Sequence, residues 1–241
     1  MGAVMLVYIL ISAVLLSLLI GGFCVFFDQA VLTRRGTIYR IKSAEKKIAL
    51  TFDDGPSPEW TPKILDELKD SNIKATFFLI GYHVQKYPDI ARRIVAEGHE
   101  VGNHGYAHSV MFYYTPAEIE EEIKYTEHVI REITGVTTKI FRPPKAWLQK
   151  VIKEKIKSMG YSIILWSLNS KDWVMFNHKN IAKYLSSNIR NGDILLFHDS
   201  GNVTRTEGGK RTQTVKCISL LAKMLREKGY EFVTTKELIN G

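Results

Sequence analysis

Short apolar runs alternate with helical patterns from residue 47 onward, and this alternation is the strongest constraint on the fold. The strand-like runs are residues 47–52, 74–81, 99–104, 139–143, 161–169, 193–199 and 230–235. The segments between them carry apolar side chains at helical spacing, as Ile64, Leu65 and Leu68 illustrate. Buried strands that alternate with helices are typical of a parallel sheet covered by helices. The sequence therefore predicts an α/β fold with seven strands, arranged as an open sheet or as a barrel.

Two of the predicted helices show how the pattern is delimited. Residues 84–98 read as one helix that Gly98 ends. In the helix predicted over 115–135, Thr115 suits the N-cap and Pro116 suits the first helical position. Glu118 completes a capping box, and the glutamates that follow lie where the helix dipole favours them. The structural explanation accounts for these acidic residues, so we assign them no catalytic role.

Polar side chains gather where the predicted strands end. They are Asp53, Asp54, His104, His108, Arg142, Asp172 and His198. In parallel α/β folds the carboxyl ends of the strands carry the functional site, and in a barrel all the loops at that end share one rim. Five strand ends that supply one pocket therefore favour a barrel over an open sheet.

The residue types at these strand ends indicate hydrolytic metal chemistry. His104 and His108 in "HGYAH" could be two surface histidines, but with a nearby carboxylate they form a set typical of a catalytic metal. An arginine at a strand end, such as Arg142, is suited to holding a carboxylate. A histidine at a strand end, such as His198, stays protonated and can act as an acid when a carboxylate lies beside it. The residues without such partners are expected to be structural or solvated histidines, namely His83, His99, His128 and His178, and a loop cap, Asp199.

Five motifs in order resemble the polysaccharide deacetylase family, the NodB-homology domains of carbohydrate esterase family 4. The motifs are "TFDDG" at 51–55, "HGYAH" at 104–108, "RPP" at 142–144, "DW" at 172–173 and "LFH" at 196–198. The resemblance covers roughly residues 46–237 and implies a distorted (β/α)7 barrel. It also implies metal-dependent N-deacetylation of a cell-wall polysaccharide, with release of acetate. The expected substrate is the N-acetylglucosamine or N-acetylmuramic acid of peptidoglycan, or a chitin-like oligosaccharide.

The resemblance also implies which residues perform the reaction. Asp54, His104 and His108 would bind a divalent metal, zinc being expected first and cobalt or another divalent ion as alternatives. Asp53 would be the catalytic base and Arg142 would orient it.

The remaining family positions supply an acid and a pocket. Asp172 would pair with His198, the general acid. Trp173 and Leu196 would wall the pocket, and Lys145 would present its backbone N–H to the oxyanion.

The sequence departs from the family pattern at a few positions. Gly105 replaces a Ser or Thr, Lys145-Ala146 replaces an aromatic residue and a glycine, and Asn169 replaces an aspartate. None of these changes removes an expected metal ligand. We therefore expect an active enzyme, in which the side-chain change at Lys145 bears on substrate preference.

The first 28 residues are expected to anchor the protein in a membrane. Residues 3–27 carry no charge, and at ~1.5 Å per residue they can cross a ~30 Å hydrocarbon core. A cleaved signal peptide is the alternative, but it usually has a basic start and a small-x-small cleavage site, and neither is clear here. The expected organisation is an anchor at 1–28, a basic juxtamembrane segment at 29–45 and the catalytic domain at 46–241.

The flanking charge and the family substrate predict opposite sides of the membrane for the catalytic domain. Basic residues follow the span: Arg34, Arg35, Arg40, Lys42, Lys46 and Lys47. The positive-inside rule would keep the domain in the cytoplasm, whereas the substrate of the family implies the extracellular side, which we expect.

Net charge narrows the choice of partners and leaves two other functions open. The formal net charge is +8, but no basic run is interleaved with aromatic residues, so we expect no nucleic-acid binding. No obligate protein partner is evident. A metallohydrolase that acts on another amide or small molecule, with a cytoplasmic location as the flanking basic residues suggest, is the first alternative. An inactive wall-binding module is the second, and the complete Asp-His-His set argues against it.

Overall fold

A computed structural model describes residues 2–28, 30–175, 177–201 and 209–241, in which eight strands form one parallel sheet. The strands are β1 (Lys47–Asp53), β2 (Thr76–Leu79), β3 (Glu100–Asn103), β4 (Ile140–Phe141), β5 (Ser162–Ile163), β6 (Leu168–Asn169), β7 (Ile194–His198) and β8 (Glu231–Val233). Their order is β5-β4-β3-β2-β1-β7-β6, with β8 beside the start of β1. The parallel pairing confirms the predicted α/β class.

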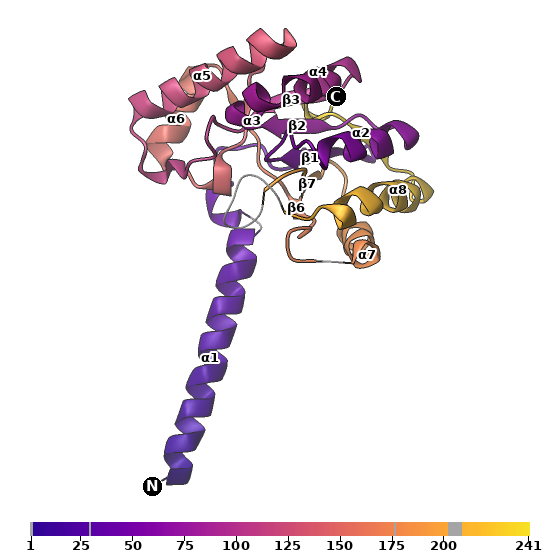
Figure 1. Ribbon diagram of the computed structural model, residues 1–241. Coiled ribbons are helices and arrows are strands. Elements are labelled where there is room, and N and C mark those ends of the chain that lie inside the picture. Colours follow the sequence, from indigo (N-terminus) through magenta and orange to yellow (C-terminus); the bar gives the residue numbers. More distant parts are fainter. Residues whose placement is uncertain (1, 29, 176, 202–208) are drawn as a thin grey trace.

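Helices cover the outside of this sheet, and a long helix projects away from it (Figure 1). The helices are α1 (Gly2–Asp28), α2 (Thr61–Asp70), α3 (Gly81–Lys86), α4 (Pro88–Ala96), α5 (Pro116–Thr134), α6 (Lys150–Ser158), α7 (His178–Asn188), α8 (Thr212–Glu227) and α9 (Thr235–Asn240). The predicted capping box at the start of α5 is present, with Thr115 and Glu118 each bonded to the other's backbone N–H.

The central strand β1 is buried because its side chains are apolar on both faces. Its register places Asp53 opposite His198 of β7 on one side and opposite Phe78 of β2 on the other. Ile48, at the start of β1, is completely buried and belongs to the core between the strands and the helices. The rigid centre of the fold therefore ends at the two aspartates.

Two predicted elements are each divided into two in the structure. The helix predicted over 84–98 is replaced by α3 and α4, which meet at Tyr87, because Pro88 cannot continue the hydrogen bonding of a preceding turn. The strand predicted over 161–169 is replaced by β5 and β6. Between them Ile164 pairs with Ile38, a residue far away in the sequence.

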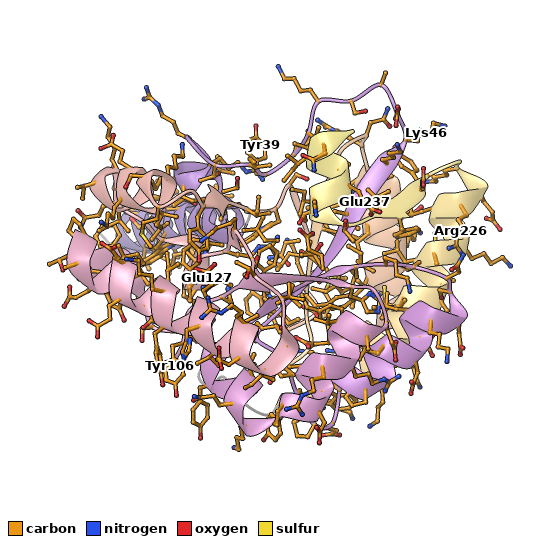
Figure 2. All side chains as sticks on the ribbon, turned by 90° about the horizontal axis from the view of Figure 1, so that it is seen from above. Tyr39, Lys46, Tyr106, Glu127, Arg226 and Glu237 are labelled. Atoms are coloured by element: carbon orange, nitrogen blue, oxygen red, sulfur yellow. The ribbon has the colours of Figure 1, made fainter. Side chains whose placement is uncertain are left out.

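Residues 30–41, here called the strap, connect α1 to the far end of the barrel. Residue 29, where the juxtamembrane segment was expected to begin, lies outside the described residues. The strap bridges the gap between β5 and β6, and it ends where Arg40 pairs with Asp193 at 2.5 Å and Ile41 bonds to Gly192 at 2.9 Å. Figure 2 shows Tyr39 of the strap at the outer edge of the domain. The strap is therefore part of the fold.

Three short 3-10 helices complete the described elements. They are η1 (Val31–Thr33), η2 (Met111–Tyr113) and η3 (Pro144–Ala146). η1 lies in the strap, and the other two lie in connections that follow β3 and β4. All three therefore lie outside the regular layers of the barrel.

Candidate active site

The carboxyl end of β1 places two carboxylates in one pocket. Asp53 is the last residue of β1, and Asp54 follows it with a φ of 79°. Adjacent side chains of a regular strand point to opposite faces, so this left-handed residue is what redirects the second carboxylate. His104 Nε2 lies 3.4 Å from Asp54 Oδ1 and 3.9 Å from Asp53 Oδ2. Both carboxylates thus face the same histidine, as expected from the end of the strand.

The expected metal ligands converge in the structure. Asp54 Oδ1 lies 3.4 Å from His104 Nε2 and 3.1 Å from His108 Nε2. The three potential ligand atoms all lie within 4.8 Å of one another. His104 follows β3 directly, and a turn with Gly105 at φ 77° and His108 at φ 57° brings the second ring back to the first.

The hydrogen bonding of His104 shows that this cluster fits a cation. His104 Nδ1 lies 2.7 Å from the carbonyl oxygen of Arg142, which can only accept, so Nδ1 carries the proton. In the neutral ring Nε2 then presents a lone pair to the carboxylate of Asp54. Acceptors that face each other in a buried site are stabilised by a positive ion, and a second-shell carbonyl on a ligand histidine is usual at metal sites.

Arg142 holds one oxygen of Asp53. The guanidinium is completely buried and donates to Asp53 Oδ1 at 2.7 Å and to Thr51 Oγ1 at 2.8 Å. Its other nitrogens donate to the carbonyl oxygens of Ile164 and Leu165 at 3.1 and 3.2 Å. A planar group with this many fixed partners holds a carboxylate in one orientation. Asp53 Oδ2 is left directed toward the His104 side of the pocket.

Asp172 holds His198 on the opposite side of β1. His198 Nδ1 lies 2.8 Å from Asp172 Oδ1, and the backbone N–H of His198 donates to Asp172 Oδ2 at 3.0 Å. The hydroxyl of Thr214 donates to the same oxygen at 2.8 Å. Burial alone lowers the pKa of His198, but the charge of Asp172 outweighs it and the pKa is raised. Asp172 therefore favours the protonated form of the ring and leaves its Nε2 unengaged.

Comparisons with known proteins place this geometry in a family. A sequence model described as Polysaccharide deacetylase matches residues 40–164. A peptidoglycan-N-acetylglucosamine deacetylase of Bacillus cereus is 35% identical over 207 residues, which cover 83% of this chain and 92% of the relative. The chain belongs to the polysaccharide deacetylase family.

Other members of the polysaccharide deacetylase family extend this result. A chitooligosaccharide deacetylase of Bradyrhizobium is 35% identical over 195 residues, covering 78% of this chain and 89% of its own length. The crystal structure of a peptidoglycan N-acetylglucosamine deacetylase superposes with a TM-score of 0.79 at 32% identity, covering 84% of this chain and 92% of that one. The expected (β/α)7 barrel of the family is thereby confirmed.

The residues expected to wall the pocket of this polysaccharide deacetylase differ in exposure. Trp173, in the connection after β6, is 38% exposed, whereas Leu196 of β7 is 3% exposed. Leu196 packs in a buried cluster with Trp166 and Ala146. Lys145 has an exposed side chain and a φ of 58°, so its backbone turns sharply where the family aromatic is replaced. Leu196 thus comes from a strand, whereas Trp173 and Lys145 come from two different connections after strands.

His83 supports the metal cluster in a way that its sequence did not reveal. Sequence reasoning treats it as a structural or solvated histidine because no partner is close in the chain. The ring is completely buried in α3, and its Nδ1 lies 2.7 Å from the carbonyl oxygen of Asp54. That oxygen can only accept, so His83 donates and fixes the backbone of a ligand residue. The only feature of the sequence that could have indicated this role is the position of His83, close after the carboxyl end of β2.

Asp199 is also more than the loop cap that its sequence indicates. Its backbone N–H donates to the backbone carbonyl oxygen of Asp53 at 3.1 Å, and its Oδ2 accepts from the hydroxyl of Thr61 at 2.6 Å. A Cβ at Gly55 would lie 2.0 Å from the same Oδ2, so only glycine fits this turn. Burial raises the pKa of Asp199 to about 7. The residue packs under the turn that carries both aspartates.

Two further polar residues near the site are held by hydrogen bonds to the backbone. His99 is buried and accepts from the backbone N–H of Ala75 at 3.2 Å, and burial lowers its pKa to about 4, as expected of a structural histidine. Asn169 Oδ1 accepts from the backbone N–H of Lys171 at 2.8 Å, so the asparagine at this departure from the family pattern still braces the turn before Asp172.

Proposed function

We propose that this chain is a metal-dependent deacetylase that removes acetyl groups from an N-acetylated cell-wall polysaccharide. The observation that carries the proposal is one pocket that holds a metal-ligand cluster, a carboxylate fixed by a buried arginine and a histidine charged by a buried aspartate. Family membership supports the same reaction. The relatives act on different sugar polymers, as their names state, and we propose peptidoglycan as the first candidate substrate and chitooligosaccharide as the second.

Asp54, His104 and His108 would hold the metal. Two imidazoles and one carboxylate are a usual ligand set for catalytic zinc, which we therefore propose, with cobalt as a possible substitute. When bound, the metal supplies Lewis-acid chemistry, which polarises a carbonyl and acidifies water.

The other residues would move two protons. Asp53 Oδ2 accepts a proton from water as the water oxygen bonds to the acetyl carbon, while Arg142 keeps Oδ1 in place. His198 Nε2 then donates a proton to the sugar nitrogen as the C–N bond breaks. Acetate and a free amine are the products, and the sugar gains a positive charge at neutral pH. Trp173, Leu196 and the backbone of Lys145 would enclose the acetyl group.

Acetate release would test the proposal directly. The full-length protein in detergent should release acetate from peptidoglycan or from N-acetylglucosamine oligomers, and a chelator should abolish this release. Asp53→Asn should keep the metal but lower kcat by roughly 10³, because general-base catalysis contributes about 10²–10⁴. Activity that survives the chelator would refute metal dependence. Loss of the metal in Asp53→Asn would show that the roles of the two aspartates are exchanged.

We further propose that α1 anchors the protein in the cell membrane and that the catalytic domain lies outside the cell. The apolar stretch Val4–Gly22 of α1 is entirely exposed within the chain, as a membrane span would be. The structure also gives two of the basic residues after it another role, because Arg34 bonds to the carbonyl oxygens of Trp166 and Ser167, and Arg40 pairs with Asp193. Their presence therefore needs no cytoplasmic location. A topology reporter fused after residue 241 would test the side of the membrane.

A further inference from the structure

The strap fixes the base of the anchor at the catalytic end of the barrel. Thr33 and Arg35 accept hydrogen bonds through their carbonyl oxygens from Lys153, near the start of α6. A Cβ at Gly36 would lie 3.2 Å from Lys157 Nζ, one turn further along α6. The strap therefore runs along α6 away from the site and reaches the opposite end of the barrel at Ile41. Its first residue, Ala30, must lie at the end where α6 begins.

Ala30 is itself packed beside the pocket. It is 5% exposed and belongs to the buried cluster of Ala146, Leu165, Trp166 and Leu196. Leu196 is one of the residues assigned to the pocket above, and Ala146 directly follows another, Lys145. Asp28, the last residue of α1, is only two residues from Ala30, so at 3.8 Å between consecutive Cα atoms their separation is at most ~8 Å. The anchor thus emerges next to the mouth of the pocket.

The length of α1 places this junction at the membrane surface. Its 27 residues span ~40 Å at 1.5 Å per residue, which matches a bilayer of ~40–45 Å including the headgroup layers. A helix that crosses the whole bilayer ends at the outer edge of the headgroups. Ala30 and the pocket rim would therefore lie within reach of the lipid headgroups, without a flexible spacer.

The rim consists of the connections and first helical turns that follow the carboxyl ends of the strands. It carries the exposed apolar side chains that a position at the membrane surface requires. Outside α1, the structure describes ten large apolar side chains that are exposed, and eight of them lie on a connection or first helical turn that follows the carboxyl end of a strand. These eight are Tyr82, Val110, Phe112, Tyr113, Trp147, Val151, Trp173 and Val174. The amino ends of the strands carry none among the described residues. Exposed apolar residues gathered on one end of a protein mark an interaction surface.

The aromatic and charged residues of the rim fit a lipid surface on the side of the anchor. The ring centroids of Phe112 and Trp147 lie 6.5 Å apart. Trp147 directly follows Ala146, which belongs to the same buried cluster as Ala30. Lys145 and Lys150 flank Trp147, both with exposed side chains. Aromatic rings and basic residues are enriched together at the membrane–water interface, where lysines attract anionic lipids. The acidic first turn of α5 follows Tyr113 in the chain, whereas Lys145 and Lys150 lie on either side of Trp147 in the sequence.

We propose that the mouth of the pocket faces the bilayer, and that the enzyme acts on an N-acetylated saccharide presented at the membrane surface by a lipid. Phe112, Tyr113, Trp147 and Val174 lie in the headgroup layer, and the opposite end of the barrel is directed away from the membrane. The inference about the substrate rests on the proposed deacetylase function, and the orientation rests on the proposed anchor. The orientation holds for either side of the membrane.

Spin labels would test the orientation without any assay of activity. In full-length protein with Cys24→Ser, labels at Tyr113→Cys, Val151→Cys and Val174→Cys report on the rim. Glu45→Cys and Glu227→Cys are matched exposed controls at the other end, and the natural Cys217 is buried. The protein is reconstituted in vesicles of phosphatidylcholine and phosphatidylglycerol. For each label, the collision rate with oxygen is divided by the collision rate with a water-soluble nickel chelate. This ratio should be severalfold higher for the rim labels than for the control labels. Equal water accessibility at both ends, with the protein floating with the vesicles, would overturn the orientation alone. Failure to float would overturn the anchor and the orientation together.

Activity on two forms of one sugar would test the substrate class. N-acetylchitotetraose coupled to a phospholipid headgroup in the same vesicles should be deacetylated at least ~10-fold faster than the free oligosaccharide, because both partners are confined to one surface. Tyr113→Ser should reduce this ratio without changing the rate on the free sugar, whereas Tyr125→Ser, an exposed tyrosine of α5 outside the rim, should not. Equal rates on both sugars would overturn the membrane-bound substrate. Release of acetate from neither sugar would instead contradict the proposed function, which the spin labels do not test.

Discussion

The pocket contains two carboxylate–imidazole groups that use the same chemistry for opposite purposes. The proposed metal half consists of Asp54, His104 and His108, and the proposed acid half consists of Asp172 and His198. In the acid half both carboxylate oxygens accept hydrogen bonds, from the ring, the backbone N–H of His198 and Thr214. In the metal half one carboxylate oxygen faces two ring nitrogens, and the proton of His104 is used elsewhere, on the carbonyl of Arg142.

The difference shows that the partner of the other ring nitrogen decides what a histidine does. In the acid half the carboxylate takes the N–H of Nδ1, which stabilises the charged ring and frees Nε2 to donate a proton. In the metal half a backbone carbonyl takes the N–H of His104 and leaves Nε2 as an acceptor. One arrangement favours a proton at the pocket, and the other favours a metal ion.

Removing a ring from the metal half should have the largest effect. His104→Ala should abolish stoichiometric metal binding and lower kcat by at least ~10³, because both the Lewis acid and part of the pocket are lost. Metal content by mass spectrometry and acetate release would measure the two losses. His128→Ala, an exposed histidine of α5, is the matched control and should change neither. Full metal content in His104→Ala would contradict the ligand assignment.

Removing the carboxylate of the acid half should leave the metal bound. Asp172→Asn should lower kcat by roughly 10²–10³, the range of general-acid catalysis. Because Asp172 raises the pKa of His198 above the ordinary value of 6.5, the loss of activity at high pH should move to lower pH in the variant. The same interaction stabilises the fold fully below that ordinary value and is lost as pH rises through the folded pKa. The exposed variant Asp70→Asn serves as control, and an unmoved pH profile in Asp172→Asn would contradict the assigned acid.

Much of the fold was predictable because the apolar pattern is local. β1, β2 and α5 occupy nearly the ranges that periodicity and the capping box indicate. The break between β5 and β6 was not predictable, since its cause is Ile38, which pairs with Ile164 across more than a hundred residues. The strap was predicted only as a basic juxtamembrane segment. Its contacts with the barrel depend on tertiary structure.

The candidate site was predictable where a motif carries its own geometry. Motifs located the residues that meet in the pocket, because each follows the end of a strand. His83 escaped prediction because it comes from a helix and contacts a backbone oxygen, which no sequence pattern records. Asp199 was read as a loop cap because its burial under Gly55 is visible only in three dimensions.

His83 offers a way to weaken the metal half without touching a ligand. His83→Phe removes the donor to the Asp54 carbonyl but fills the same buried space, so it should weaken metal affinity about 10–100-fold, as loss of a second-shell contact does. His83→Asn can still donate a proton and should restore part of the affinity. Competition with a chromogenic chelator would measure each dissociation constant. The buried His99, replaced in His99→Phe, is the control, and an equal loss of affinity there would mean that the effect is only structural.

Thr214 offers the corresponding small change in the acid half. Thr214→Val keeps the shape of the side chain but removes one of the hydrogen bonds to Asp172 Oδ2, worth ~1 kcal/mol, so kcat should fall about fivefold. With one donor fewer, the Asp172 carboxylate attracts the His198 proton more strongly, and the loss of activity at high pH should move slightly upward, opposite to Asp172→Asn. Metal affinity should not change. Thr126→Val, at a buried threonine that bonds only within α5, should alter stability without moving the pH profile. A downward shift in Thr214→Val would show that the hydroxyl chiefly positions the carboxylate rather than competing for its charge.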